Sequence, residues 1–545
     1  MKDLRQHNLD QLQESVFDIC IIGGGATGAG AALDAAARGY KVLLIEKNDF
    51  GSGTSSKSTK LIHGGVRYLE QAFKKLSIGQ YRMVSKALHE RATLLKIAPH
   101  ITRPLQLVTP CRTWIEGVYY FIGLKLYDFI SGRSHIGKSE LLSRQKALQK
   151  IPTLKTKGLF SAVVYYDGQL DDLRFNWALI QTAITKGAIC INHTVLHAFQ
   201  KTGAGKIVGA TIVDALTGKQ YSVNAKLFVN ATGPFSDSVR LLANEMLLPR
   251  MQVSKGVHIL LPKQMMPSSS ALLIPKTKDG RLIFAIPYQK HLLVGTTDDP
   301  GVVSEKEFGP TAQEVQYLLE YVNEYLDVQA TKADVLAGFG GLRPLVKKSG
   351  ESTKDLVRDH EVEIDERSGL ISILGGKWTT YRLMAKDTID AAEKFLHSQS
   401  PCSTKSLVLI GSETFTHHTA IQLQQQSGWD HEVVKHLAST YGDQSLKIAA
   451  ITLADANAKN RLLPGMPYTY AELHYVVEHE MAYTVKDAIA GRWGTPLASW
   501  QQAMQLIPVV GSYMTHYFNW GLEQQEKYIH QYQLELKTII DGSNV

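Results

Sequence analysis

A glycine-rich turn between two apolar segments constrains the fold of this chain most strongly. Residues 17–46 have the sequence FDICIIGGGATGAGAALDAAARGYKVLLIE. The apolar, β-branched residues 17–22 predict a buried strand, and residues 41–45 predict a second strand. Between them, the alanine-rich residues 29–38 predict a helix that ends at Gly39. A strand, a glycine turn, a helix and a strand therefore follow one another in one short unit.

The spacing of the glycines points to a use for this unit. Gly23 permits a tight turn, Gly25 lets a backbone approach a pyrophosphate, and Gly28 allows close packing of helix on strand. The amides and the dipole at the helix N-terminus then hold the phosphate charge. Glu46 ends the second strand 18 residues after Gly28, close to the offset of about 20 expected for a carboxylate that binds a ribose hydroxyl. The segment predicts a dinucleotide site, because a merely structural turn would explain neither Glu46 nor the spacing.

Size, charge and cysteine content narrow the class of protein. A chain of 545 residues predicts two or three domains. The net charge of +8 predicts a mildly basic surface, which is compatible with docking on an anionic membrane face. No Lys/Arg-rich run with interleaved aromatic residues indicates nucleic acid. The four cysteines lie far apart without a CxxC pair, so we expect neither a disulfide framework nor a zinc or other metal site.

Targeting and membrane-spanning segments are not expected. The N-terminal sequence MKDLRQHNLDQLQES is polar and contains acids, unlike a signal or transit peptide. No apolar run reaches the length of about 18 residues that a membrane crossing needs. The most apolar and aromatic stretch, residues 115–131, carries Glu116, Lys125 and Asp128. It predicts a packed helix or strand pair, with membrane contact as the alternative.

Beyond about residue 400 the sequence predicts amphipathic helices. One begins after Asp430, a good N-cap, and ends before Gly442. A later helix carries His474 and His479, but a spacing of five does not suit a metal site on one helical face. These two histidines are therefore expected to be surface or core residues.

Two later segments favour FAD over NAD as the dinucleotide. An ATG sequence follows an apolar strand at residues 231–233, and GGKWTTYRL precedes a helix at residues 375–383. A tightly held flavin needs contacts from several distant segments, whereas NAD needs mainly one. Thr379 or Thr380 would cap the following helix, whose positive end would face the flavin pyrimidine, and Lys377 would add to that field. An ordinary capped helix is the alternative.

Seven motifs in this order show a resemblance to a known family. They are IIGGGATGAGAALDAAARG, TSSKSTKLIHGGVRYLE, VNATGPFSD, KGVHILLP, LLVGTTDDP, GLRPL and GGKWTTYRLMA. Together they resemble the FAD-dependent glycerol-3-phosphate dehydrogenase family, of the aerobic, quinone-linked type. The resemblance covers nearly the whole chain, including YAELHYVVEHE and DAIAGRWGT near the C-terminus. The second and the last of the seven motifs are specific to this family, whereas the first is shared widely.

The resemblance implies an α/β (α+β) FAD-binding, Rossmann-like fold of the glycine/D-amino-acid oxidase type. A substrate domain with a mixed sheet and an all-helical C-terminal cap domain would complete it. The oxidoreductase part would span residues 1–400 and the helical domain residues 401–545. Within the first part, FAD-binding segments are expected at about 17–80, 180–255 and 335–395, interleaved with substrate-domain segments at about 81–179 and 256–334.

The resemblance also assigns the residues that would bind FAD. They come from the glycine turn, the end of the second strand, the hydroxyl-rich loop after it, the ATG sequence and the GGKWTT sequence. They are Gly23, Gly24, Gly25, Ala26, Thr27, Gly28, Glu46, Lys47, Thr54, Ser55, Ser56, Leu61, His63, Gly64, Gly65, Ala231, Thr232, Gly233, Gly376, Lys377, Thr379 and Thr380.

The activity that the resemblance implies is oxidation of sn-glycerol 3-phosphate to dihydroxyacetone phosphate, with hydride transfer from C2 to flavin N5. Electrons would pass to a membrane quinone, ubiquinone or menaquinone. The protein would be cytoplasmic and peripheral on the inner face of the cytoplasmic membrane, binding its anionic surface. It would serve glycerol and glycerophospholipid catabolism, and a homodimer is one assembly to test.

A phosphate dianion needs fixed cations, ideally arginines with bidentate geometry. The resemblance places a positive cluster at Arg67, Arg343, Arg358 and Lys377, with Tyr68 and His258 beside it. A neutral histidine is the natural base for the C2 hydroxyl proton near neutral pH. We therefore assign catalytic roles to His258, Arg343 and Lys377. His63 is the alternative base, and release of the proton to water is a third route. Val257 departs from the family, where a small polar residue is frequent.

Two other functions stay open at this point. An oxidase on the same scaffold would pass electrons to O2 and make H2O2, and the acceptor depends on channel access to the flavin. A non-catalytic flavoprotein would keep the fold and lose turnover, but it would have no need of the four cations. The helical C-terminal part and the basic surface favour the membrane-linked dehydrogenase.

Overall fold

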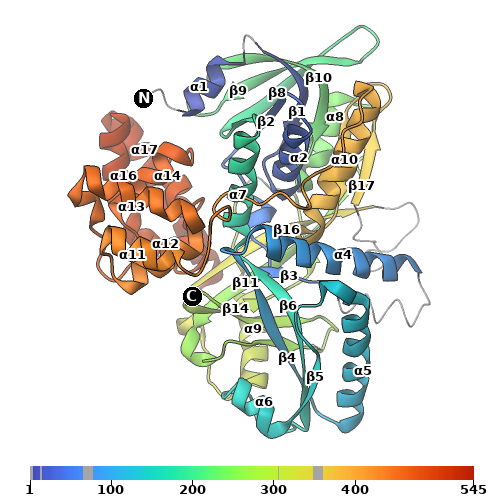
Figure 1. Ribbon diagram of the computed structural model, residues 1–545, viewed down its shortest axis with the longest axis vertical. Coiled ribbons are helices and arrows are strands. Elements are labelled where there is room, and N and C mark those ends of the chain that lie inside the picture. The colour runs from blue at the N-terminus through green and yellow to red at the C-terminus, as the bar shows by residue number, and fades with distance from the viewer. Residues whose placement is uncertain (1–3, 13–14, 66–77, 276, 305, 348–359) are drawn as a thin grey trace.

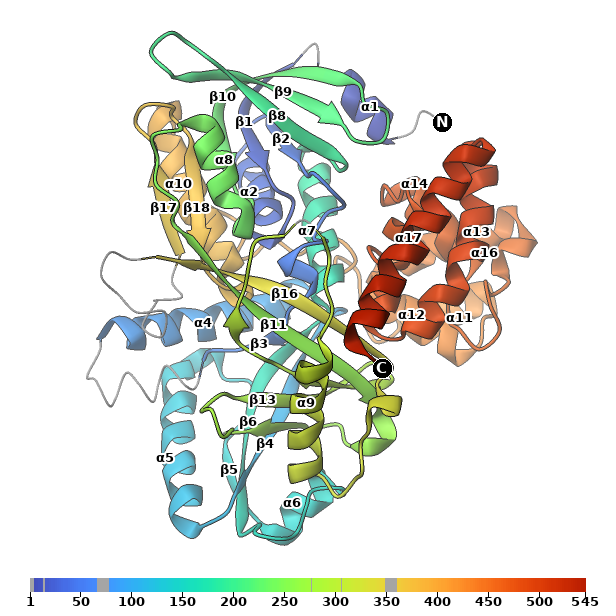
Figure 2. The same ribbon diagram turned by 180° about the vertical axis from the view of Figure 1, so that it is seen from behind.

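Two β-sheets and a C-terminal group of helices make up the molecule (Figure 1; Figure 2). The computed structural model describes residues 4–12, 15–65, 78–275, 277–304, 306–347 and 360–545. No helix in these ranges combines the length with the apolarity that a bilayer crossing demands.

The first sheet has a parallel centre and antiparallel additions. Its strands run in the order β17-β18-β10-β1-β2-β7, and β9 joins β10 and β8 from the side. From β18 to β7 neighbouring strands are parallel, whereas β17 and β9 pair antiparallel. The strands are β1 (Val16–Ile22), β2 (Val42–Ile45), β7 (Ile189–Ile191), β8 (Thr194–Lys201), β9 (Ile207–Asp214), β10 (Gln220–Asn230), β17 (His360–Ile364) and β18 (Ile371–Gly375).

Helices cover one face of the first sheet. Successive side chains of a strand point to opposite faces, so alternate residues of β1 belong to different cores. Ile19 and Ile21 of β1 belong to the core that includes these helices, while Cys20 and Ile22 belong to the core on the opposite face. The alanine side chains of α2 allow a close approach to both neighbouring helices. The helices on this face are α2 (Ala26–Ala37), α7 (Asp172–Thr185) and α10 (Tyr381–Leu396); α1 (Leu4–Asp10) and α8 (Ser236–Ala243) lie elsewhere around the sheet.

The second sheet is mainly antiparallel, in the order β15-β11-β14-β13-β12-β4-β6-β3, with β16 added to β11 and β5 to β6. Only the β12–β4 pair is parallel among its described pairings. Its strands are β3 (Leu61–Ile62), β4 (Thr102–Cys111), β5 (Glu140–Ser143), β6 (Ser161–Leu170), β11 (Met251–Pro262), β12 (Ala271–Ile274), β13 (Ile283–Tyr288), β14 (His291–Gly295), β15 (Asp299–Pro300) and β16 (Ala337–Val346). The helices around it are α4 (Ile78–Ile97), α5 (Trp114–Ser131), α6 (Arg144–Lys150) and α9 (Ala312–Tyr325).

Two elements lie near the boundaries of the expected FAD-binding and substrate-domain segments. β16 lies in the segment 335–395 expected to bind FAD, yet it pairs with β11 of the second sheet from Met251↔Val346 to Leu260↔Ala337. α7 begins in the segment 81–179 expected in the substrate domain and continues into the segment 180–255 expected to bind FAD, and it packs on α2. An apolar pattern indicates a buried strand or helix but not which sheet it joins, and the segment boundaries stay predictions.

The C-terminal helices confirm one sequence prediction in detail. Asp430 caps α12 by accepting hydrogen bonds from the amides of Glu432 (3.0 Å) and Val433 (3.3 Å). Gly442, with φ +59°, follows the last residue of the helix. The helices are α11 (Thr419–Ser427), α12 (His431–Tyr441), α13 (Ser445–Ala454), α14 (Tyr470–His479), α15 (Val485–Ile489), α16 (Trp500–Phe518) and α17 (Leu522–Ser543).

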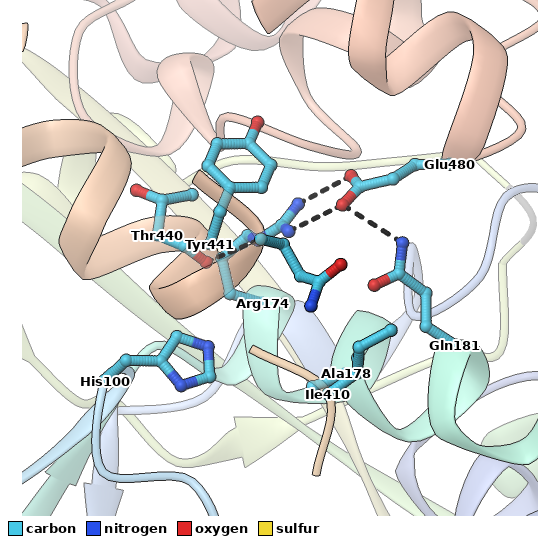
Figure 3. A pocket seen from close by; sticks show the side chains of 9 residues that line it. His100, Arg174, Ala178, Gln181, Ile410, Thr440, Tyr441 and Glu480 are labelled. Atoms are coloured by element: carbon cyan, nitrogen blue, oxygen red, sulfur yellow. Dashed lines mark hydrogen bonds and ion pairs between the residues drawn. The ribbon is translucent and has the colours of Figure 1, made fainter. Parts of the chain in front are cut away.

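A buried ion pair joins the C-terminal helices to α7. Arg174 of α7 donates two hydrogen bonds of 2.8 Å to the carboxylate of Glu480, and its guanidinium lies over the Tyr441 ring (Figure 3). His100 borders the same pocket, whose volume of about 10 Å³ matches a single water molecule. Burial, followed by the charge of Arg174, lowers the pKa of His100 to about 3. The charge of Arg174 in this pocket is therefore neutralised by Glu480, and we interpret the pocket as part of a structural contact.

Candidate functional site

The glycine turn has the cramped geometry that a dinucleotide-binding turn requires. Gly23 adopts φ +106°, which L side chains rarely adopt. A Cβ on Gly28 would lie 1.8 Å from the Gly23 carbonyl oxygen, so only glycine fits there. The turn delivers the chain into α2 with Gly25 as its N-cap. This cradle fits the pyrophosphate of a dinucleotide such as FAD.

Glu46, just beyond β2, ties the turn to the first sheet. Its Oε2 accepts a hydrogen bond from the Gly24 amide at 2.6 Å, and its Oε1 accepts one from the Asn48 amide at 2.9 Å. Burial raises the pKa of this carboxyl, although the two amides oppose the rise. The carboxylate thus fixes the turn, and its contact with a ribose hydroxyl stays a prediction.

The hydroxyl-rich loop after β2 connects three of the expected cofactor segments. Ser55, in the 3₁₀ turn Thr54–Ser56, accepts a hydrogen bond on Oγ from the Ala26 amide at the start of α2 (2.9 Å). Its carbonyl accepts one from Trp378 Nε1 (2.7 Å). Thr54 Oγ1 donates to the Leu342 carbonyl of β16 (2.7 Å). This loop therefore holds the first sheet, the second sheet and the GGKWTT segment together.

The GGKWTT segment uses its threonines differently from the expectation. Thr380 occupies the N-cap position of α10, but no described side chain caps that helix. Its hydroxyl donates to the Lys377 carbonyl at 3.2 Å. Thr379 Oγ1 instead accepts from the His63 amide at 3.3 Å and lies 3.4 Å from the His63 carbonyl. The threonines thus hold the segment against the loop after β3, which sequence periodicity alone cannot indicate.

The remaining expected cofactor residues lie in several elements, and the ATG sequence is the one beside the glycine turn. The Ala231 amide donates to the Ile22 carbonyl at 2.8 Å, which sets the ATG sequence beside the glycine turn. Thr232 Oγ1 donates to Asn230 Oδ1 at 2.7 Å. Lys47 Nζ lies 5.9 Å from the Phe235 ring centre. Thr27 belongs to α2, Gly233 begins a 3₁₀ turn, Ser56 and Leu61 are buried, Gly64 and Gly65 follow β3, and Gly376 follows β18.

His258 is buried in β11 beneath the hydroxyl-rich loop. Its residue is 2% exposed, and its ring stacks on Phe339 with centroids 5.0 Å apart. Nε2 lies 3.0 Å from Thr59 Oγ1. Nδ1 is buried and has no hydrogen-bond partner in the described part of the chain. A buried polar atom normally has a hydrogen-bond partner, so this nitrogen is an exception that calls for an explanation.

Arg343 of β16 shares a sheet face with His258, because Arg343 pairs with Ser254 and Phe339 with His258. Its guanidinium donates to Asp298 Oδ1 (2.9 Å), to Thr296 Oγ1 (3.0 Å) and to the Thr297 carbonyl (2.9 Å). Its side chain is 24% exposed, so part of the cation still faces solvent. The arginine is held by hydrogen bonds but still accessible to an anion.

A second cation near His258 is Lys60. It is 1% exposed, donates to the Ser56 carbonyl at 2.6 Å and forms an ion pair with the buried Asp172. Burial lowers the pKa of His258 well below its usual range, and the charges of Arg343 and Lys60 lower it further. His258 is therefore neutral at physiological pH.

Of the other expected substrate residues, only Lys377 lies within the described part of the chain. Lys377, after β18, is half-buried with Nζ 3.9 Å from Met83 Sδ of α4. Arg67, Tyr68 and Arg358 lie outside the described residues. Arg343 and His258 are thus the two expected substrate residues that the structure brings to one face.

Sequence reasoning missed the residues that support His258. Thr59 and Lys60 follow the predicted cofactor hydroxyls in TSSKSTK, and Asp172 begins α7, 112 positions after Lys60. The only local signal was the density of hydroxyl and lysine residues in that loop. The pairing of Lys60 with Asp172 depends on the meeting of distant segments.

One group of described residues has a spacing that suits a metal ion: Asp49, His193 and Asp487. Its charges are already neutralised by protein groups. Arg492 forms an ion pair with Asp49, and His193 Nε2 lies 2.9 Å from Asp487 Oδ2. The Arg492 guanidinium also lies 3.6 Å from the Trp177 ring centre. The group is an ion-pair network that anchors the C-terminal helices to the turn after β2.

Comparison with known proteins agrees with this geometry. Residues 18–382 match the family described as FAD dependent oxidoreductase, and residues 402–525 match the C-terminal domain of alpha-glycerophosphate oxidase. The mitochondrial glycerol-3-phosphate dehydrogenase of Bos taurus is 44% identical over 529 residues, which cover 94% of this chain and 72% of that protein. The chain belongs to the FAD-dependent glycerol-3-phosphate dehydrogenase family. It is a flavoenzyme of this family, and its cofactor is FAD.

Another relative and two solved structures are also similar to this chain. The mitochondrial glycerol-3-phosphate dehydrogenase of Homo sapiens is 44% identical over 97% of this chain and 74% of that protein. A structure of glycerol-3-phosphate dehydrogenase from Bacillus halodurans complexed with FAD has a TM-score of 0.81, 29% identity and 98% coverage of both chains. A glycine oxidase from Geobacillus kaustophilus has a TM-score of 0.51 at 21% identity, covering 72% of this chain and 98% of that chain. The predicted glycine-oxidase type of fold is confirmed.

Proposed function

We propose that this enzyme oxidises sn-glycerol 3-phosphate to dihydroxyacetone phosphate. The observation that carries the proposal is the pairing of a partly accessible guanidinium, Arg343, with a buried neutral imidazole, His258, on one sheet face. The relatives from Bos taurus and Homo sapiens are named for this substrate. When bound, FAD supplies the hydride acceptor at its N5 atom.

In this proposal Arg343 binds the substrate phosphate. A guanidinium offers a planar fork of donors that matches phosphate oxygens. The bonds from Arg343 to Asp298, Thr296 and Thr297 pre-organise that fork, so little side-chain freedom is lost on binding. Lys377, and Arg67, Tyr68 and Arg358 beyond the described residues, stay predicted partners of the same anion.

His258 accepts the C2 hydroxyl proton as the C2 hydrogen leaves with its electron pair. A histidine with so low a pKa is a weak base in the free enzyme. A phosphate dianion on Arg343 offsets one of the two cations that depress it. Substrate binding therefore raises the basicity of His258 when a base is needed, and Thr59 fixes the ring.

For the electron acceptor we propose a membrane quinone, ubiquinone or menaquinone, reached from a peripheral position on the inner face of the cytoplasmic membrane. The basic net charge of +8 supports attraction to anionic lipid. O2 is the second candidate, because residues 402–525 match a domain named for an oxidase.

Product and acceptor can be tested in one experiment. Purified holoenzyme is incubated with sn-glycerol 3-phosphate or unphosphorylated glycerol, and dihydroxyacetone phosphate is measured. We expect product only from the phosphorylated substrate, and equal turnover of glycerol would refute the phosphate site. Stopped-flow reoxidation of reduced enzyme by a soluble quinone should outpace reoxidation by O2. The reverse order with H2O2 formation would identify an oxidase.

A further inference from the structure

The His258 imidazole lies deeper than a base that meets its substrate directly. The residue is 2% exposed, and Phe339 covers one face of the ring. A Cβ added at Gly295 would lie 2.2 Å from His258 Cδ2, so the neighbouring strand β14 leaves no space at that edge. Nε2 points at Thr59 Oγ1, 3.0 Å away. A base must reach its proton directly or through one intermediate group, and this burial favours an intermediate.

Thr59 has the exposure and the chemistry of such an intermediate. Unlike His258, this residue is partly exposed. A threonine hydroxyl has one donor hydrogen and two acceptor lone pairs. Among the residues that the structure describes, its one side-chain hydrogen bond is the contact with His258 Nε2. When the hydroxyl donates to Nε2, its lone pairs can accept the O–H group of a substrate.

The residues on both sides of Thr59 hold it in this place. Ser58 donates to Oδ2 of the buried Asp172 from its amide (3.1 Å) and from its hydroxyl (2.6 Å). Lys60 forms an ion pair with Oδ1 of the same carboxylate and adopts φ +60°, which residues other than glycine rarely adopt. Such strain persists only where the surroundings enforce it, and it clusters at functional sites. The position of Thr59 is therefore determined by its neighbours.

The Arg343 guanidinium lies on the same sheet face as His258, at a distance that suits a small phosphorylated alcohol. It lies over Gly256, where an added Cβ would be 2.4 Å from one of its nitrogens. Gly256 and His258 are two residues apart in β11, so their Cα atoms lie on one face about 7 Å apart. A phosphate on Arg343 would thus leave a short carbon chain within reach of the hydroxyl over His258.

We propose that Thr59 is a catalytic residue that relays the substrate proton to His258. Its Oγ1 accepts the C2 hydroxyl proton while its own hydrogen passes to His258 Nε2. The C2 hydrogen leaves with its electron pair to FAD, so the C2–O bond becomes a carbonyl, Thr59 is again a hydroxyl and His258 is an imidazolium. Before the step the neutral ring carries its hydrogen on Nδ1. The inference rests on the proposed oxidation of sn-glycerol 3-phosphate with His258 as the base.

Single-turnover reduction of the holoenzyme under anaerobic conditions isolates this step. Bleaching of the flavin band at about 450 nm is followed after mixing with saturating sn-glycerol 3-phosphate. Thr59→Val keeps the shape and removes the hydroxyl, so its flavin should be reduced about 10²-fold or more slowly, at a similar half-saturating concentration. Thr59→Ser keeps a hydroxyl and should stay within about threefold of wild type. Thr538→Val on α17, whose hydroxyl bonds to the Leu534 carbonyl, is the matched control and should match wild type.

Two measurements test the relay in wild type, without a substitution at Thr59. In mixtures of H2O and D2O the reduction rate should follow a curve, because two protons move in one step, whereas a single moving proton gives a straight line. ¹⁵N NMR of the histidine-labelled holoenzyme, with His258→Asn to assign the signal, should show the Nδ1–H form of the His258 ring. The relay requires this form because Nε2 has to be the acceptor.

The outcomes separate the relay from the proposed function. A wild-type reduction rate in Thr59→Val, where His258→Asn is slow, would overturn the relay and leave the proposed function intact. A straight line in the H2O and D2O mixtures, or an Nε2–H form of the ring, would have the same consequence. A wild-type flavin that sn-glycerol 3-phosphate does not reduce would overturn the proposed function and the relay with it.

Discussion

Nε2 of His258 lies 3.0 Å from Thr59 Oγ1, so a strand of the second sheet and the loop after the first βαβ unit meet at this imidazole. The loop that carries Thr59 also bonds to the start of α2 through Ser55 and to β16 through Thr54. The geometry of the dinucleotide turn and that of His258, the proposed base, are thereby linked through one short segment. This link makes several outcomes predictable.

Replacing Gly28 with alanine should abolish flavin retention. Its Cβ would lie 1.8 Å from the Gly23 carbonyl oxygen, and neither backbone can yield without opening the turn. The purified variant should be colourless while keeping its secondary structure in circular dichroism. Gly203→Ala, where a Cβ meets nothing within 4 Å, is the control and should keep its flavin. A yellow Gly28→Ala protein would show that the turn is not needed for binding.

Replacing Arg343 with alanine should raise KM by about 30-fold or more, as a desolvated phosphate loses a charged partner worth roughly 2–4 kcal/mol. Arg343→Lys should recover part of the loss, since one ammonium replaces the fork. Arg250→Ala serves as the control, because Arg250 lies just before β11 and its guanidinium bonds to Glu361 and Glu363 of β17. KM is measured by steady-state kinetics with a dye acceptor. An unchanged KM in Arg343→Ala would show that Arg343 does not bind the substrate phosphate.

Replacing His258 with asparagine should lower kcat by about 10²–10⁴ and change KM little. The acid limb of kcat in wild type reports protonation of His258 in the substrate complex and should vanish in the variant. A limb in kcat/KM from the substrate phosphate, whose second pKa is about 6, should persist. If the variant retains the wild-type kcat, the base lies elsewhere, and His63→Asn is then the next variant to measure.

Replacing Glu480 with glutamine should destabilise the protein by about 3–5 kcal/mol, because it leaves the buried Arg174 charge uncompensated. The urea midpoint should fall accordingly. Glu478→Gln, at a side chain 22% exposed, removes the pairs with His474 and His479, both partly exposed, and should shift the midpoint far less. Equal shifts in the two variants would argue against the Arg174 pair as the contact that holds the helices.

Glu307 should make stability depend on acid pH. Burial alone would raise its pKa, but Lys57 and Lys486 lower it from 4.5 to about 2. Its stabilising contribution is therefore complete above about pH 4.5 and is lost as the pH falls toward 2. Glu307→Gln should lower the free energy of unfolding in urea at pH 7 by about 1 kcal/mol, the value for a partly exposed pair, and the difference should shrink below pH 4.5. A difference independent of pH would contradict this role.

Local signals predicted local structure well. The glycine spacing predicted the turn between β1 and α2, and Asp430 with Gly442 predicted both ends of α12. The family motifs predicted the fold and the cofactor. In each case the residues that determine the structure lie within a few positions of one another, or in a pattern that identifies the family.

Long-range pairings could not be predicted in the same way. The bond between Thr379 and His63, the ion pair of Lys60 with Asp172 and the place of β16 beside β11 all join segments far apart in sequence. Tertiary packing determines these pairings, and the hydrophobic periodicity of a single segment does not indicate its distant partner. The division of the chain near residue 400 and the roles of Arg67, Tyr68 and Arg358 stay predictions.

An anaerobic titration of the oxidised holoenzyme with sn-glycerol 3-phosphate tests the central claim most directly. The flavin band at about 450 nm should bleach in wild type. In Arg343→Ala it should bleach only at much higher substrate concentration, and in His258→Asn it should bleach far more slowly. Bleaching of all three proteins at the same concentration and rate would contradict the account.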